Sequence, residues 1–421
     1  MKSTRLALRL KTKNTLLGRL QNIHFIATEV IATIVRYYWN GPKVPSWCLR
    51  FHIIHNVLRQ YLSQSLPHNM PNEAASKIDF DFIANYIDMN NLPCRPLKPH
   101  VGYNREHVID IDASNCKVYS VSQYGLSSEK LNALATADID AARRSQPRQM
   151  SCQVLFSTQH SCFQTPHVDN MLDIKPMHAD ERIILHFHGG AYCVGERSLT
   201  HIHVYARISQ ATGLRVFSPN YRLAPRHCFP SQLHDCFLAY SYIVSCGFKP
   251  ENIVLSGDSA GGALAIGVLF LLRDMKLDMP KTAVLISPWV DATCSGKSWS
   301  ASQHLDYLPP LHLEDPFHPT RMFYDPGRTF SSEMRKELQC PLISPVFSTD
   351  LSGLPPMLIQ MGSNERLRED IQLFADKVTQ HSPDARPTLE IYDNMPHAFV
   401  LFDFAEAARQ AFASIGEFVC L

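Results

Sequence analysis

The most constraining feature of this chain is a serine on a glycine-rich turn. Ser259 stands in the run Gly257-Asp258-Ser259-Ala260-Gly261-Gly262, after the apolar residues 253–255 and before an apolar, helix-forming stretch at 263–272. A buried strand, a tight turn and a helix in this order predict a nucleophile elbow, which raises a serine hydroxyl into a cleft. Such a turn strains the serine backbone, so the positions two residues before and after it need small side chains, and both are glycine here. The helix that starts beside the serine would direct free amide groups at an oxygen that gains charge.

A second segment upstream has a similar form, an apolar strand that runs into glycines. It is Ile183-Ile184-Leu185-His186-Phe187-His188-Gly189-Gly190-Ala191-Tyr192. Because glycine lets the main chain approach a substrate oxygen, we predict that the amides of Gly189, Gly190 and Ala260 form an oxyanion hole. His188 is expected to hold this loop by hydrogen bonding, and Asp258 to support the site. The alternative for this segment is a strand end with a buried histidine.

The expected base is His397, which follows a strand-like run at 388–392 in the segment Asp393-Asn394-Met395-Pro396-His397. A histidine in a loop beyond a strand can reach a serine hydroxyl, and its near-neutral pKa suits proton transfer in both directions. The chain has 20 histidines, so this assignment depends on position and context.

The expected acid is Glu365, just after a predicted strand at 356–361. A carboxylate there can accept the second ring N–H of His397 and stabilise the imidazolium that forms in the transition state. Three other carboxylates are close in sequence. We expect Glu369 and Asp370 to lie on the solvated face of the next helix, and Asp393 to form a turn.

Together these motifs resemble the hormone-sensitive-lipase-like branch of the α/β hydrolases, the GDXG group of microbial and fungal esterases. The resemblance covers roughly residues 181–421 and rests also on Tyr221-Arg222-Leu223-Ala224-Pro225, Phe229-Pro230, Asp235, Ser287-Pro288-Trp289-Val290-Asp291, Ser344-Pro345 and Leu351-Ser352-Gly353-Leu354-Pro355-Pro356. It implies an α/β-hydrolase fold: a mostly parallel, eight-stranded sheet with helices on both faces and a helical cap. It also implies hydrolysis of carboxylic esters without a cofactor or a metal.

The chain departs from the family pattern at three positions. Ala191 replaces the usual third glycine, Glu365 replaces the usual aspartate, and Arg226 replaces an acidic residue. Ala191, Tyr192 and Trp289 are predicted to line the substrate pocket, although core packing remains open for Tyr192 and Trp289.

Composition limits the possible partners and compartments. A formal net charge of +1 over 421 residues indicates no nucleic-acid partner. The 12 cysteines form no Cys-x-x-Cys pair and no secretion signal is evident, which favours reduced thiols inside a cell. We expect a cytoplasmic protein or one peripheral to the endoplasmic reticulum membrane, with a mitochondrial presequence as the lesser alternative. The paired histidines at 186/188 and 201/203 have no accompanying cysteine or carboxylate cluster, so no metal is assigned.

We predict three regions: an N-terminal helical part at 1–100, a strand-containing lead-in with an insertion at 101–180, and a catalytic core at 181–421 with a cap insertion at about 293–342. Residues 1–21 carry six basic and no acidic side chains. The apolar stretch 23–39 contains Glu29 and Arg36, which favours an amphipathic helix over a membrane span. Residues 1–39 could therefore contact an anionic membrane surface or pack over the cleft. A second helix with one apolar face is expected at 47–62, either lining a pocket or packed on the core.

The substrate class is less constrained by the sequence. Aromatic residues in the cap insertion, with no core of their own to join, favour an apolar substrate such as a sterol ester or an acyl ester. Two other functions remain possible: an amide hydrolase of the aryl-formamide type, and a non-catalytic small-molecule receptor on the same fold, which would lose the base that His397 supplies here. The oligomeric state is not constrained.

Overall fold

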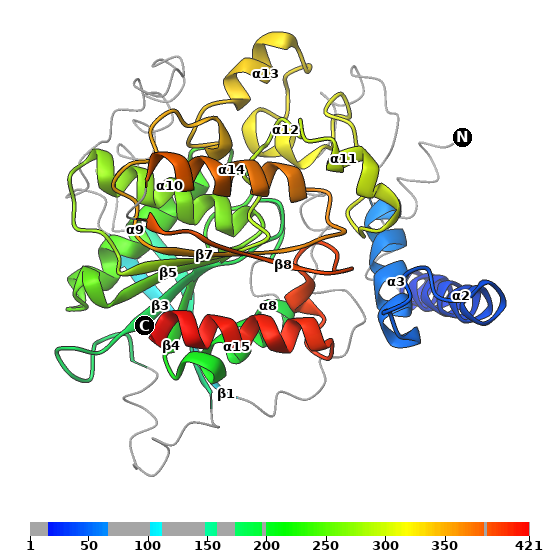
Figure 1. Ribbon diagram of the computed structural model, residues 1–421, viewed down its shortest axis with the longest axis horizontal. Coiled ribbons are helices and arrows are strands. Elements are labelled where there is room, and N and C mark those ends of the chain that lie inside the picture. The colour runs from blue at the N-terminus through cyan, green and yellow to red at the C-terminus, as the bar shows by residue number, and fades with distance from the viewer. Residues whose placement is uncertain are drawn as a thin grey trace.

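The computed structural model describes residues 16–65, 102–111, 148–157, 173–195, 199–382 and 385–420. Its centre is an eight-stranded sheet with the strand order β1-β2-β4-β3-β5-β6-β7-β8 (Figure 1). The strands are β1 (Gly102–Ile111), β2 (Arg148–Ser157), β3 (Ile183–Phe187), β4 (Arg215–Pro219), β5 (Ile253–Asp258), β6 (Thr282–Ile286), β7 (Met357–Gly362) and β8 (Thr388–Tyr392). β2 is antiparallel to both β1 and β4, and all the other pairs are parallel. The predicted α/β-hydrolase fold is confirmed.

Helices cover both faces of this sheet. Figure 1 shows α9, α10 and α14 on one face and α8 and α15 on the other. The helices are α2 (Leu16–Asn40), α3 (Leu49–Ser65), α8 (Leu199–Thr212), α9 (Ser231–Ser245), α10 (Ala260–Asp274), α11 (Ser298–Ala301), α12 (Pro319–Tyr324), α13 (Ser332–Leu338), α14 (Arg368–His381) and α15 (Glu406–Cys420). Short 3₁₀ turns are η5 (Pro250–Asn252), η6 (Ser302–His304), η7 (Pro345–Phe347) and η9 (Phe399–Leu401).

The two covered faces explain why the central strands are mostly apolar. Along β3, Ile183, Leu185 and Phe187 belong to the core on one face of the sheet, whereas Ile184 belongs to the core on the other. Alternate side chains of a strand point to opposite faces, so a parallel strand buried on both sides is apolar at most positions. The carboxyl ends of β5, β7 and β8 meet along one edge, which is where Ser259, Glu365 and His397 follow.

The two N-terminal helices pack beside the sheet, with α3 between α2 and the rest of the molecule (Figure 1). The predicted second helix is present, and its apolar residues pack on the core: Trp47 precedes α3 and is buried, and Phe51 stacks on Phe402 at a centroid distance of 4.4 Å. Trp47 Nε1 also donates to the carbonyl of Asn394 at 2.7 Å. Trp47, in the turn that leads into α3, thus holds the loop that leads to His397.

Across the described ranges, none of the helices combines the length and the apolarity that crossing a bilayer requires. This agrees with the amphipathic helix predicted for residues 23–39, which lies within α2.

The expectation that the cap aromatics have no core to join is wrong. Between residues 293 and 342, Phe317 and Phe323 are buried in the main core, and Tyr307 is buried in the core on the opposite face of the sheet. Their burial is explained by packing, so these side chains carry no information about the substrate. The three-region division stays a prediction; β1 and β2 from the lead-in are hydrogen bonded into the same sheet as the core. The insertion expected between these two strands lies outside the described residues.

Candidate active site

Ser259 occupies the sharp turn between β5 and α10 with φ 53° and ψ −120°. Its amide donates to the carbonyl of Ile286 at 2.9 Å, and its carbonyl accepts the Trp289 amide at 2.8 Å. The flanking glycines are required sterically. A Cβ on Gly257 would lie 2.3 Å from the Gly261 oxygen, and one on Gly261 would lie 2.0 Å from the Phe187 oxygen. The strained left-handed conformation of Ser259 is therefore held by its surroundings.

The loops after β7 and β8 bring Glu365 and His397 to this serine. His397 Nε2 lies 2.8 Å from Ser259 Oγ, and His397 Nδ1 lies 3.1 Å from Glu365 Oε2. All three side chains are buried, Glu365 completely. The predicted serine, histidine and glutamate are thus in one hydrogen-bonded line. The competing carboxylates Glu369 and Asp370 are on α14, and Glu369 accepts the amide of Lys297. The solvated position expected for Asp370 is wrong, because this residue is buried.

The surroundings of His397 favour its protonated form. Burial alone would lower the pKa of this imidazole, but the hydrogen bond and the charge of Glu365 outweigh burial, with smaller contributions from Asp306 and Asp258, and the pKa lies above its usual value. An imidazole with a raised pKa is a stronger base when neutral and holds the proton more firmly once it has accepted it.

Asp306 is part of this site and was not anticipated from the sequence. It is completely buried. One carboxylate oxygen accepts the His397 amide at 3.4 Å, and the other accepts the Arg366 amide at 2.8 Å. Asp306 therefore holds the backbone at both the histidine and the residue after Glu365. No motif surrounds it in the sequence, so only the fold reveals its role.

The glycine loop after β3 differs from the prediction at one position. The amide of Gly189 donates to Asp258 Oδ1 at 3.0 Å. This N–H already has a buried carboxylate acceptor, so Gly189 does not fit the oxyanion role that we predicted for it. By contrast, no hydrogen bond involves the amides of Gly190, Ala191 or Ala260 within the described residues. Gly190 and Ala191 both have positive φ, 114° and 53°, which turns the chain at this point.

Asp258 connects three elements around the loop. Its carboxylate lies 3.1 Å from His186 Nε2 on β3 and 3.5 Å from His201 Nε2 on α8, besides accepting the Gly189 amide. A Cβ on Gly189 would lie 2.3 Å from Asp258 Oδ2, so only glycine fits there. Asp258 is placed to support the loop, as the sequence suggested, and His186 and His201 are partners that sequence reasoning missed.

His188 lies on the same loop, with its Nδ1 2.7 Å from the Gly189 oxygen. Its ring stacks on Tyr221 at a centroid distance of 4.2 Å, and the Tyr221 hydroxyl donates to the His188 carbonyl at 2.6 Å. Burial, with the neighbouring His201, lowers the pKa of His188 to about 3. A neutral, stacked imidazole suits a structural position and does not supply a proton near neutral pH.

Of the three predicted pocket residues, two are part of the core. Tyr192 is buried and stacks on Phe323 at 3.9 Å and on Trp289 at 5.6 Å between ring centroids. Trp289 Nε1 donates to the Asp291 carbonyl at 2.9 Å. The burial and ring contacts of Tyr192 and the indole hydrogen bond of Trp289 favour the core-packing alternative for both side chains. Ala191 is half-buried beside the glycine loop.

Within the part of the chain that the structure describes, no group of three histidine, cysteine or carboxylate side chains is arranged to hold a metal ion. The residues that meet around Ser259 are instead a nucleophile, a base, a carboxylate and free backbone amides. Their geometry is that of acyl transfer through a serine.

Comparison with known proteins agrees with this geometry. Residues 184–401 match a family model described as the alpha/beta hydrolase fold, and this range contains all three aligned side chains. The chain belongs to the hormone-sensitive-lipase-like branch of the alpha/beta hydrolases. The fold and the order of serine, acid and histidine along the chain are those of this family.

The relatives of this alpha/beta hydrolase include an esterase from Acinetobacter venetianus, which is 32% identical over 252 residues, 58% of this chain and 77% of the relative. A carboxylesterase/phospholipase from Mycobacterium tuberculosis is 30% identical over 244 residues, 56% of this chain and 61% of the relative. Among solved structures, a hormone-sensitive lipase from a metagenome library has a TM-score of 0.52 and 29% identity, covering 64% of this chain and 82% of that one.

Proposed function

We propose that this hydrolase cleaves small apolar or lipid-like carboxylic esters, with Ser259 as nucleophile, His397 as base and Glu365 as the supporting acid. Its family and its relatives make the chain an esterase-class hydrolase. The observation that carries the residue assignment is the double contact of His397, 2.8 Å to Ser259 and 3.1 Å to Glu365. A base that touches both its nucleophile and its orienting carboxylate is ready for proton transfer.

The reaction proceeds in two half-reactions. His397 Nε2 takes the hydroxyl proton as Ser259 Oγ attacks the ester carbonyl, while Nδ1–H donates to Glu365. The oxyanion accepts hydrogen bonds from the free amides of Gly190, Ala191 and Ala260, the last at the start of α10. The imidazolium then gives its proton to the leaving alkoxide oxygen. Water, deprotonated by His397, then attacks the acyl-serine, and the imidazolium returns this proton to Ser259 Oγ as the acid leaves.

Ester preference is tested against the amide alternative with matched substrates. We expect a higher kcat/KM for p-nitrophenyl butyrate than for the corresponding p-nitroanilide and for formanilide, because p-nitrophenolate is a better leaving group than an amide nitrogen. Initial rates over a series of acyl lengths, with a cholesteryl ester included, would define the acyl and alcohol preference.

An equal or larger kcat/KM on formanilide would favour the aryl-formamide alternative. If the protein binds the esters but hydrolyses neither the esters nor the amides, the receptor hypothesis is favoured. The position of His397 disfavours the receptor hypothesis, because a protein that only binds its ligand does not require a base in contact with the serine.

We further propose that residues 1–39 contact an anionic membrane surface, with the protein cytoplasmic or peripheral to the endoplasmic reticulum. Support comes from α2, where Ile31, Val35, Tyr38 and Trp39 are all exposed. Their spacing places them on one side of the helix. Tyrosine and tryptophan favour the interface between water and lipid, and the basic residues within 1–21 favour anionic lipids.

Flotation with vesicles tests this contact. We expect the protein to float with phosphatidylcholine vesicles that contain phosphatidylserine, and to do so less at high salt because charge screening weakens attraction to the lipid. Ile31→Asp should largely abolish flotation, because it places a carboxylate in the inserted face. Leu373→Asp, a comparable change at an exposed leucine of α14, is the matched control. Flotation of Ile31→Asp at the level of Leu373→Asp would contradict the contact.

A further inference from the structure

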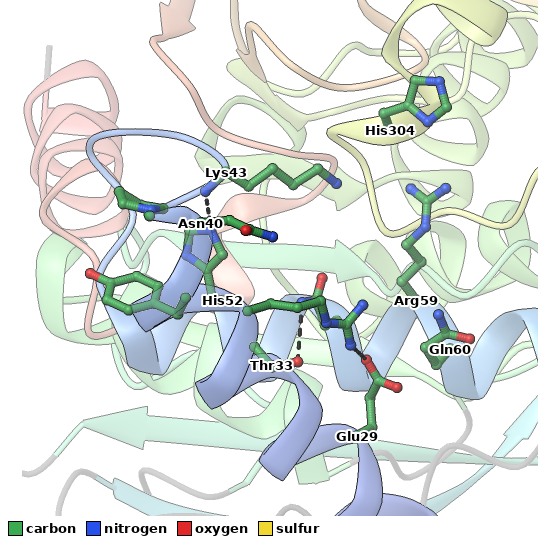
Figure 2. A pocket seen from close by; sticks show the side chains of 13 residues that line it. Glu29, Thr33, Asn40, Lys43, His52, Arg59, Gln60 and His304 are labelled. Atoms are coloured by element: carbon green, nitrogen blue, oxygen red, sulfur yellow. Dashed lines mark hydrogen bonds and ion pairs between the residues drawn. The ribbon is translucent and has the colours of Figure 1, made fainter.

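A cavity of about 420 Å³ lies between the two N-terminal helices and η6, and none of its lining residues belongs to the active site described above (Figure 2). α2, the turn after it, α3 and the cap segment each contribute to the wall. The lining residues are Glu29, Thr33, Arg36, Tyr37, Asn40, Gly41, Pro42, Lys43, His52, Asn56, Arg59, Gln60 and His304.

The charge of this lining is unbalanced. It contains three basic side chains, Arg36, Lys43 and Arg59, and one carboxylate, Glu29. Glu29 is paired with Arg36, 2.5 Å from its Nη2. Arg59 donates through Nη1 to the carbonyls of Gln303 and Asp306, the latter at 2.7 Å, which fixes its guanidinium in the wall. Two cations of the lining therefore have no carboxylate of the lining to balance them.

Lys43 is the basic side chain of the lining that is best placed to bind a ligand. Within the described residues, no hydrogen bond or ion pair involves its ammonium group, and the residue is exposed where it lines the cavity. Its backbone amide donates to His52 Nε2 at 2.8 Å, and its side chain extends toward the part of the cavity where Arg59 and His304 lie (Figure 2). Burial, with the charges of Arg59 and Arg36, lowers the pKa of Lys43 to about 8. An ammonium in such surroundings is stabilised by an anion.

The cavity is separate from the exposed apolar side of α2. Glu29, Thr33 and Arg36 line the cavity, whereas Ile31 and Val35 are exposed. Residues two positions apart on a helix are about 200° apart around its axis. A bilayer in contact with the apolar side would therefore face away from the cavity, so a ligand of the cavity is independent of that contact.

We propose that this cavity binds an anion of the phosphate class, held by Lys43 and Arg59. Lysine supplies a point charge, and arginine supplies a fixed fork of donors, both of which suit phosphate oxygens. The side chains of Asn40, Asn56 and Gln60 can hydrogen bond to a polar group attached to the phosphate. A water-soluble phosphate ester and a phospholipid headgroup share this chemistry, and the experiment separates them.

The first measurement is calorimetric titration of the full-length protein with inorganic phosphate at constant ionic strength, with chloride as the reference anion. We expect saturable binding that Lys43→Gln weakens about tenfold or more, because a charge-assisted hydrogen bond is lost. Lys336→Gln removes the same charge from the exposed surface of α13 and should bind like the wild type. Esterase activity equal to that of the wild type shows that Lys43→Gln is folded. No saturable phosphate binding, or equal binding by Lys43→Gln and the wild type, would overturn the proposal.

A second measurement reports on Lys43 itself. Sulfate does not titrate near neutral pH, so proton uptake on sulfate binding comes from the protein. In the empty cavity Lys43 is partly neutral at pH 8, and an anion raises its pKa. Calorimetric titration with sulfate at pH 8, repeated in buffers of different ionisation enthalpy, measures the number of protons taken up. We expect net proton uptake by the wild type and none by Lys43→Gln. Uptake that persists in Lys43→Gln would remove Lys43 from the site and overturn its assignment.

The source of the phosphate is resolved by competition. If glycerol 3-phosphate displaces inorganic phosphate and vesicles containing phosphatidic acid do not, the natural ligand is a water-soluble phosphate ester. Displacement by the vesicles indicates a lipid headgroup. Either result supports binding of the phosphate group.

Discussion

Ser259→Ala is expected to lower kcat for p-nitrophenyl esters by about 10⁴- to 10⁶-fold, because the nucleophile of both half-reactions is removed. The residual rate would come from the free amides at Gly190 and Ala260, which still polarise a bound carbonyl. The affinity for the substrate should change little, because Ser259→Ala removes only one small group. Steady-state kinetics on the full-length variant would measure the loss.

A fluorophosphonate probe checks the same residue independently, because it phosphorylates only a serine hydroxyl that a base activates. The wild type should be labelled, and Ser259→Ala should not. Ser300→Ala, at an exposed serine of α11, is the matched control and should keep both labelling and activity. Labelling of Ser259→Ala at the wild-type level would show that the nucleophile is elsewhere.

Glu365→Gln is expected to lower kcat by about 10² to 10⁴-fold, because a neutral amide neither fixes the tautomer of His397 nor stabilises its imidazolium. The pH profile should change as well. Glu365 raises the pKa of His397, and the reaction needs the neutral imidazole. In the wild type, activity is lost as the pH falls through this raised pKa. In Glu365→Gln the pKa is lower, so the remaining activity should persist to lower pH.

The profile of kcat/KM against pH separates this role from a purely structural one. Glu369→Gln is the same change four residues further along, on α14, and should leave both kcat and the acid limb of the profile unchanged. An unchanged acid limb in Glu365→Gln, or an equal loss of kcat in Glu369→Gln, would contradict the assignment of Glu365.

The sheet and the line from Ser259 through His397 to Glu365 follow local rules that a sequence displays directly. Apolar strands, glycines on either side of a serine, and loops just beyond strands define these positions without knowledge of distant contacts. The predicted strand, turn and helix around Ser259 are present. The two flanking glycines are required, as predicted, because a Cβ on Gly257 or Gly261 would clash with main-chain atoms.

What the sequence could not provide are the contacts between segments that are far apart along the chain. The Gly189 amide is engaged because Asp258 reaches it from another strand, 3.0 Å away. Asp306 holds the His397 amide across 91 residues, and no local pattern marks it. The aromatic residues between 293 and 342 pack on a core that is formed by distant parts of the chain. The sequence does not show this core, so the interpretation of these residues as a substrate surface is wrong.

The hydrogen bond from Trp47 to the Asn394 carbonyl has a further consequence. Residues 184–401, the range that matches the family model, include the reacting side chains but not Trp47, which holds the loop that leads to His397. The match to the family model begins at residue 184, whereas a contact that holds the loop before His397 comes from residue 47. Variation in the poorly matched N-terminal part can therefore alter turnover without touching any residue that a family comparison would flag.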